Sequence, residues 1–259
     1  MQQRRDRQVA ADDERPDAVG SSDLVPGDRH RVDARGGEVD RDGADGLLLD
    51  LGVSSLQLDD ADKGFTYRSD SPLDLRFDRD AGESAAQLVA RLDQRALADL
   101  IFELGEERGS RRIAAMIKRE REEGPVTTTG ALREAVIEAV GTGAHLNPVL
   151  SRVFQALRIA VNDELGALSQ ALEAIPEAMN PGGRVVVISY HSLEDRIVKQ
   201  WMAREQRDCL RPTTIPICVC GHKQTVKIIT RRPLRADPQE VQDNPRARSA
   251  RLRAAEVVR

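Results

Sequence analysis

Aromatic residues, long apolar runs and glycine-rich phosphate loops are all scarce in this 259-residue sequence. Four Phe, two Tyr and one Trp exclude an extended aromatic stacking surface. No apolar run approaches the roughly 18 residues that span a bilayer, and the N-terminus lacks the apolar core of a signal peptide. We therefore expect a cytoplasmic protein with no membrane partner. Because no P-loop and no G-x-G-x-x-G follows a strand-like segment, nucleotide hydrolysis and dinucleotide binding lack support.

Cysteine is also scarce, and its three residues fall in one short segment. An odd count in a cytoplasmic chain disfavours a disulfide framework. Cys209, Cys218, Cys220 and His222 offer thiolate and imidazole donors that suit tetrahedral zinc. However, the C-x-C-x-H end is tighter than the usual two-residue spacing of zinc ligands. The sequence therefore favours no metal and a loop of reduced thiols, with zinc as the alternative.

Charge is distributed unevenly along the chain. The net charge of −4 argues against general coating of nucleic acid. From Lys223 to Arg259, however, ten Lys and Arg stand against four Asp and Glu, which predicts a locally basic tail. Residues 1–45 hold twenty charged residues, a single Leu and no Ile, Phe, Tyr or Trp. Such a segment is expected to be disordered, or to be DNA translated in a foreign frame, because it can bury little apolar surface.

Two segments have the pattern of buried parallel strands that end in polar residues. The first is the apolar run before Asp50, which is followed by Gly52, Ser54 and Ser55. The second is 184–189, which is followed by Tyr190 and His191. Ligands of open α/β sheets bind at the carboxyl ends of the strands. We therefore expect Asp50 and His191 along one edge of a shared parallel sheet.

Helical periodicity dominates the sequence between the two strands. Apolar residues at three- and four-residue steps predict helices between Glu83 and Val140, with a break near Asp93, and one long helix from about Pro148 through Ile175. Within that long helix, the trio 162–164 is expected to brace a loop. A row of arginines on an earlier helix is either a solvated face or a contact surface for phosphates; it includes Arg108, Arg111 and Arg112.

Serine, histidine and aspartate all occur among the polar strand-end residues, so hydrolysis is an alternative to consider. Neither Ser54 nor Ser55 lies in a G-x-S-x-G elbow. His191 and Ser192 are sequence neighbours, which is a poor arrangement for a base and its nucleophile. The sequence therefore disfavours a hydrolase.

Several strings together carry a family resemblance. They run in order from about Asp45 to the C-terminus: 45–60, Gly64-Phe65-Thr66-Tyr67-Arg68, 154–165, 188–196 and Asn244-Pro245-Arg246-Ala247-Arg248-Ser249 with the residues to 253. On these strings the chain resembles the bacterial small-subunit ribosomal RNA cytosine-N4 methyltransferase family. Leu56 stands where that family commonly has Pro.

The resemblance implies an α/β fold with a class I S-adenosylmethionine-dependent methyltransferase (Rossmann-like) core. It implies that the core, N-terminally incomplete, spans 46–82 and 147–259, with a helical substrate-recognition insertion at 83–146. It also implies S-adenosylmethionine as the cofactor, held by Asp50 and Gln57, and methylation of a decoding-centre cytosine of 16S rRNA in the small ribosomal subunit. The sequence gives no oligomeric state.

The chemistry of this reaction fits the strand-end residues. The exocyclic amine of cytosine is a poor nucleophile because its lone pair is delocalised into the ring. Acceptors that bind its N–H groups and take up a proton help, and the sequence offers Asp50, the backbone near Ser54, and His191 as catalytic groups. A target base must be unstacked to enter the pocket, and its phosphates would be bound by arginines, namely Arg108, Arg111, Arg112, Arg248 and Arg251.

The family's first strand should end in a glycine-rich turn, and residues 1–45 contain nothing like it: Gly36-Gly37 is isolated. Two hypotheses follow. In one, the chain is the methyltransferase with a truncated or frame-shifted N-terminal region, and it binds the cofactor poorly. In the other, it is a non-catalytic rRNA-binding remnant that keeps the recognition insertion.

Overall fold

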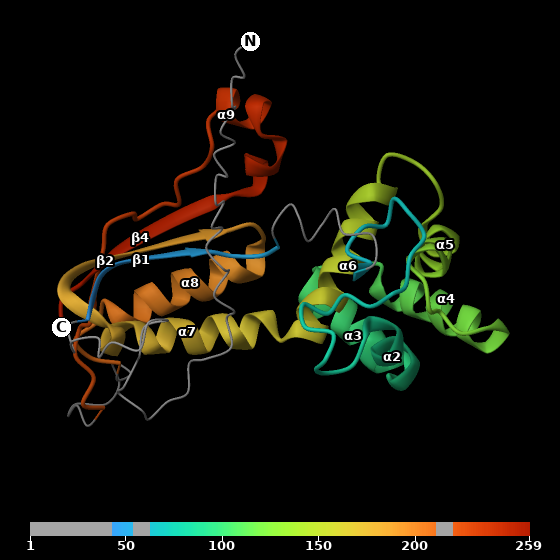
Figure 1. Cartoon of the computed structure of the whole chain (residues 1–259), viewed down its shortest axis with the longest axis horizontal. Helices are drawn as coiled ribbons and strands as arrows, with labels where there is room; N and C mark the ends of the chain where they lie inside the picture. The colour runs from blue at the N-terminus through green and yellow to red at the C-terminus, as the bar shows by residue number, and fades with distance from the viewer. Residues whose placement is uncertain (1–42, 54–62, 211–219) are drawn as a thin grey trace, which may run out of the picture. The chain divides into compact units, whose positions relative to one another are not determined.

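The computed structural model describes residues 43–53, 63–210 and 220–259, which form helices and one mixed sheet (Figure 1). The strands are β1 (Ala44–Asp50), β2 (Met179–Ser189), β3 (Val226–Ile228) and β4 (Arg251–Val257). The helices are α2 (Ala85–Arg91), α3 (Gln94–Gly105), α4 (Ser110–Glu123), α5 (Thr129–Val140), α6 (Leu146–Asn162), α7 (Glu164–Ala178), α8 (Ser192–Glu205), α9 (Pro238–Asp243) and the 3-10 helix η2 (Pro245–Ser249). No helix among these residues is long and apolar enough to cross a membrane.

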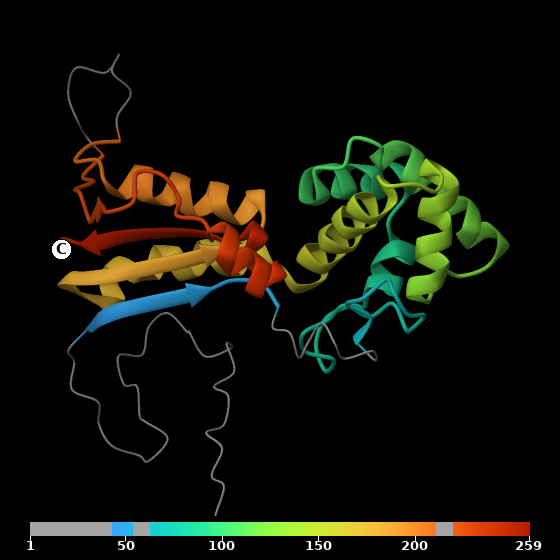
Figure 2. The ribbon, with the colours of Figure 1, turned by 90° about the horizontal axis from the view of Figure 1, so that it is seen from above.

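The sheet has the strand order β1-β2-β4-β3, and Figure 2 shows β1, β2 and β4 side by side. Strands β1 and β2 are parallel, with Asp50 opposite Ile188. Strand β4 is antiparallel to both of its neighbours. Because β1 and β2 run in the same direction, Asp50 and the residues after Ser189 lie at one edge, as the sequence predicted.

Helices α7 and α8 cover one face of the sheet (Figure 1). Leu172 of α7 and Trp201 of α8 belong to the same buried cluster as Val185 and Val187 of β2. Successive side chains of a strand point to opposite faces, so Leu48 of β1 faces away from this cluster and is 62% exposed. The expectation of two buried strands was therefore wrong for β1, whose residues are half-buried or exposed because it lies at the edge of the described sheet, and right for β2.

The helices between the two strands form a second apolar cluster. Its buried side chains include Leu97, Ile113, Leu132 and Leu157. The predicted break near Asp93 is confirmed, because the Asp93 side chain accepts from the Ala96 N–H and starts α3. The cluster also takes in residues from the preceding loop, such as Phe65, and from α6. It therefore extends to both sides of 83–146.

The expectation of one long helix through Ile175 was wrong. The chain forms α6 and α7, separated at Asp163, whose φ of 48° is left-handed. Arg158 binds Glu164 across this break with N–O distances of 2.8 and 3.0 Å. The apolar periodicity continues through the break, so the sequence pattern alone did not reveal it.

Asn162 braces the loop before α2, as the sequence suggested for the trio 162–164. Its side-chain oxygen accepts from the Phe77 N–H at 2.8 Å, and its amide donates to the Leu75 carbonyl at 2.7 Å. Leu75 has a positive φ of 63° and is almost fully buried. Asn162 thus holds a left-handed residue in place.

Replacing Asn162 with Ala should lower the free energy of unfolding by about 1–3 kcal/mol, because two buried backbone groups lose their partner. Urea titration followed by far-UV circular dichroism measures the change. Asn147→Ala, at an exposed position in the first turn of α6, is the control and should stay within about 0.5 kcal/mol of wild type. Equal effects of the two substitutions would contradict the bracing role.

The basic C-terminal segment is more structured than a tail. Its last part is β4, which lies between β2 and β3 and contributes the buried Ala255 and Val257. The mixture of charged and apolar residues in Arg251–Val257 hid an inner strand from pattern-based prediction. The interpretation of residues 1–45 concerns a segment of which the structure describes only 43–45.

Candidate functional site

Asp50 and Tyr190 meet at the carboxyl ends of β1 and β2. The Tyr190 hydroxyl donates to Asp50 Oδ1 at 2.9 Å. Burial, and then Asp50, raise the pKa of Tyr190 above its usual value, so the phenol keeps its proton and donates at neutral pH. Asp50 is exposed, and within the described residues its Oδ2 atom accepts no hydrogen bond. One carboxylate oxygen is therefore oriented while the other is open to a ligand.

The backbone after Asp50 turns sharply at Gly52. Its φ of 90° lies in the region that favours glycine. Among the described residues, the nearest atom to a Cβ at this position would be in the Tyr190 ring, at 3.8 Å. Ser54 and Gln57, which the sequence placed in the site, lie outside the described residues.

His191 caps α8. Its Nδ1 accepts from the Glu194 N–H at 3.4 Å, and Glu194 Oε2 accepts from the N–H groups of Tyr190 at 2.8 Å and His191 at 3.2 Å. The other ring nitrogen, Nε2, lies 3.1 Å from Glu194 Oε1 but is not aligned for a hydrogen bond. Both ring nitrogens therefore face Glu194, in a capping box that holds the strand end.

Glu194 is the buried partner in this arrangement, at 3% exposure. Burial alone would raise its pKa, but the contacts with His191 and the two backbone amides hold the pKa of Glu194 below its usual value. The carboxylate is thus ionised at neutral pH, where it fixes the backbone of Tyr190 and, through it, the phenol that binds Asp50.

The reaction that the family resemblance implies, methyl transfer, should stay within about tenfold of wild type in His191→Asn, because Asn is also a favoured N-cap residue. His191→Ala should lower the free energy of unfolding by about 0.5–2 kcal/mol through loss of the cap. Thermal unfolding and single-turnover transfer measure the two effects. A loss of about 10²-fold or more in a stably folded His191→Asn would instead assign proton transfer to His191.

An ion-pair cluster follows on the same helix. Asp195 accepts from Arg253 Nε at 2.6 Å and from Arg251 at 3.3 Å. Burial raises the pKa of Asp195, but the two arginines outweigh it and hold that pKa below its usual value. This cluster ties α8 to β4 directly behind the strand edge. Arg251, predicted to contact RNA, therefore already has an acidic partner.

Glu106 links the helical cluster to the start of α8. It follows α3 with a φ of 51°, and its carboxylate accepts from the Ser192 hydroxyl and from Arg196 at 2.5 Å. These hydrogen bonds, the Ser192 one first, lower the pKa of Glu106. Glu106 and Tyr190 were both missed in the sequence. The position of Tyr190 directly after a strand was the available signal, whereas Glu106 had none.

The remaining predicted residues lie at separate places. Arg108, Arg111 and Arg112 are exposed at the start of α4, and Arg248 is exposed in η2. The Sγ atoms of Cys209 and Cys220 are 3.8 Å apart. Cys218 lies outside the described residues, within which no group of three potential metal ligands occurs. The alternative of a zinc site with Cys218 and His222 stays a prediction.

Comparison with known proteins identifies the family of the chain. The sequence pattern of the MraW methylase family matches residues 19–258. The chain belongs to the MraW methylase family. This confirms the predicted resemblance and the class I S-adenosylmethionine-dependent α/β fold. The match begins within the segment interpreted as disordered or out of frame.

Relatives of this methylase are about half identical to it over the aligned residues. It is 50% identical over 218 residues to the ribosomal RNA small subunit methyltransferase H of Heliobacterium modesticaldum, covering 83% of this chain and 69% of that protein. The enzyme of the same name from Geotalea uraniireducens is 51% identical over 224 residues, which cover 85% of this chain and 72% of that protein. The enzyme of the same name from Geobacter sulfurreducens is 48% identical over 235 residues, which cover 90% of this chain and 75% of that protein.

The strand edge fits part of a methyl-donor site. The open oxygen of Asp50 can accept a hydrogen bond from an amine or ammonium group, and Gly52 allows close approach of a ligand to the backbone. These two features suit a cofactor with an α-amino group and an amine substrate.

Proposed function

We propose that this methylase transfers a methyl group from S-adenosylmethionine to N4 of a decoding-centre cytosine in 16S rRNA of the small ribosomal subunit. The observation that carries the proposal is the Asp50 carboxylate at the end of β1, oriented by Tyr190 and open at Oδ2. The names of the relatives, which are ribosomal RNA small subunit methyltransferases, support the substrate class.

Asp50 activates the amine in this mechanism. When bound, S-adenosylmethionine supplies a sulfonium methyl group, which is an electrophile. The Oδ2 atom of Asp50 accepts one amine N–H and thereby localises the nitrogen lone pair. Bound S-adenosylmethionine would supply the methyl group and leave as its thioether, and the Oδ2 atom of Asp50 would take up the proton that the amine loses. Tyr190 fixes the carboxylate, and the capping box of His191 and Glu194 fixes Tyr190. Tyr190, His191 and Glu194 are therefore positioning residues.

Recognition of the RNA falls to cations away from this edge. A base must leave its stack to reach Asp50, so the protein must bind the flanking nucleotides. Arg108, Arg111, Arg112 and Arg248 are exposed and can contact phosphates. We assign substrate recognition to the helical insertion at 83–146 and to this part of the C-terminal segment.

The second candidate is a non-catalytic rRNA-binding remnant. It is favoured by the lack of a glycine-rich loop in residues 1–45, where Gly36-Gly37 is the single pair of adjacent glycines. The remnant would bind the small subunit through the same arginines and would not bind the cofactor.

One set of measurements separates the two. Small subunits lacking the modification are incubated with the protein and S-adenosylmethionine labelled in its methyl group, and N4-methylcytidine is quantified by mass spectrometry after digestion. Calorimetry with S-adenosylmethionine is run on the same protein. Label in N4-methylcytidine supports methyl transfer. Binding to subunits without cofactor binding or transfer supports the remnant, and transfer to another nucleoside overturns the proposed target.

A further inference from the structure

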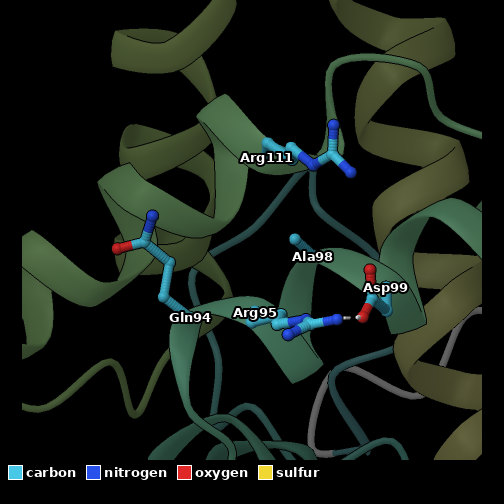
Figure 3. Close-up of a pocket in the computed structure, with 5 residues that line it drawn as sticks. All are labelled: Gln94, Arg95, Ala98, Asp99 and Arg111. Carbon is cyan, nitrogen blue, oxygen red and sulfur yellow. Dashed lines mark ion pairs between the residues drawn. The ribbon is translucent and has the colours of Figure 1, made fainter.

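A pocket lies on the helical cluster, away from the strands that carry Asp50 and Tyr190. Its volume is about 430 Å³, and it is lined by Gln94, Arg95, Ala98, Asp99 and Arg111. In Figure 3, Arg95 extends toward Asp99 along α3, and Arg111 stands across from them on α4. Ala98 lies between them and leaves the space open. The pocket therefore combines a small apolar floor with a guanidinium group on its wall.

Phe102 lies on α3 beyond the residues that line this pocket. It follows Ala98 by four residues and Asp99 by three, so it lies on the same face of the helix, one turn further on. Its side chain is 56% exposed, although the chain has only four Phe. The nearby Leu97 and Ile101 are fully buried, so packing of α3 does not depend on Phe102. An aromatic ring is thus presented to solvent beside the pocket.

The segment that follows α3 is rich in arginine. Arg108, Arg111 and Arg112 are exposed, and the first turn of α4 holds no acidic residue. Glu107 precedes this turn, but its carboxylate is engaged by the Gly109 N–H at 2.7 Å and by Arg152 at 2.6 Å. On α3, Asp99 lies 3.9 Å from Arg95 in an ion pair.

Glu103 is the remaining exposed acidic side chain on this part of α3. Two arginines, Arg95 and Arg111, and one acidic residue, Asp99, line the pocket, and Phe102 follows Ala98 by one helical turn. A flat ring flanked by cations suits a nucleic acid base with its phosphates. A protein partner would instead favour a broader apolar surface than this single side chain offers.

We propose that Phe102 and the pocket beside it form a subsite for an unstacked nucleotide of the rRNA substrate, separate from the target cytosine. The base stacks on Phe102, and Arg111 contacts its phosphate. The inference rests on the proposed function for the class of substrate, namely single-stranded RNA. It adds a stacking contact that holds a flanking nucleotide on the helical insertion.

A short single-stranded RNA oligonucleotide and an abasic oligonucleotide of equal length test the subsite, with dissociation constants measured by fluorescence anisotropy. Wild type should bind the base-containing probe at least about fivefold more tightly, the lower limit for stacking on an aromatic side chain. Phe102→Ala should remove this difference and Phe102→Tyr should keep it. Arg111→Gln should weaken binding of both probes alike and reduce the salt dependence by about one phosphate contact.

The controls separate failure of the subsite from failure of the proposed function. Leu234→Ala removes another exposed apolar side chain, outside the helical insertion. It should leave the dissociation constants of both probes unchanged. Loss of the base-dependent difference in Phe102→Ala supports the subsite even if the chain transfers no methyl group. Methyl transfer with equal base dependence in wild type and Phe102→Ala overturns the subsite alone. An effect of Phe102→Ala on intact small subunits but not on the RNA probes also overturns it and assigns Phe102 to a protein partner.

Discussion

Replacing Asp50 with Asn is expected to lower the rate of methyl transfer by about 10²- to 10⁴-fold, the range for loss of a positioned proton acceptor. The Asn amide can still accept from Tyr190, so the geometry of the strand edge is retained. What is lost is the anionic oxygen that takes the amine proton. Single-turnover transfer to unmodified small subunits, with cofactor and subunits saturating, measures the rate.

Tyr190→Phe is the matched control for this substitution. It removes the hydroxyl that orients Asp50 but leaves the carboxylate, so the rate of methyl transfer should fall by only about tenfold. The double variant Asp50→Asn with Tyr190→Phe should be little slower than Asp50→Asn alone. Because Asp50 is exposed, the free energy of unfolding of both single variants should stay within about 0.5 kcal/mol of the wild-type value. A rate for Asp50→Asn within about tenfold of wild type would show that another group accepts the proton.

Replacing Asp195 with Ala should lower the free energy of unfolding by about 3 kcal/mol. The side chain of Arg253 is only 7% exposed, and without Asp195 it loses its partner in a site that is closed to water. Urea unfolding at neutral pH measures the effect. Asp243→Ala, at an exposed position in α9, is the control and should change stability by less than about 0.5 kcal/mol.

Two further measurements test this assignment. Arg253→Met in the Asp195→Ala background removes the orphaned charge and should recover more than half of the loss. The pKa of Asp195 is lower in the folded than in the unfolded state, where a carboxyl of this type titrates near pH 4. The stabilisation is therefore present above about pH 4 and is lost as the pH falls through the folded pKa. If Asp195→Ala were as stable as wild type at pH 7, the stabilising role of the Asp195–Arg253 pair would be disproved.

The sequence determined the local elements of this methylase. The apolar runs before Asp50 and Tyr190 predicted two strands, and the break near Asp93 predicted a helix boundary; the structure confirms the strands and the boundary. Family strings identified the methylase fold without any coordinates. These features were predictable because strands, caps and apolar periodicity depend on neighbours a few residues apart.

Long-range contacts were decided only by the tertiary structure. The hydrogen bond between Tyr190 and Asp50 joins residues 140 positions apart, and that between Arg253 and Asp195 joins residues 58 apart. Asn162, next to the break at Asp163, binds the Leu75 carbonyl and the Phe77 N–H, which are 87 and 85 positions away. Strand β4 is recognisable as a strand only once β2 and β3 lie on either side of it. The sequence thus identified which carboxylate ends the strand, while the pairing of distant segments decided what orients it, since hydrogen-bond partners are chosen by proximity in the folded chain.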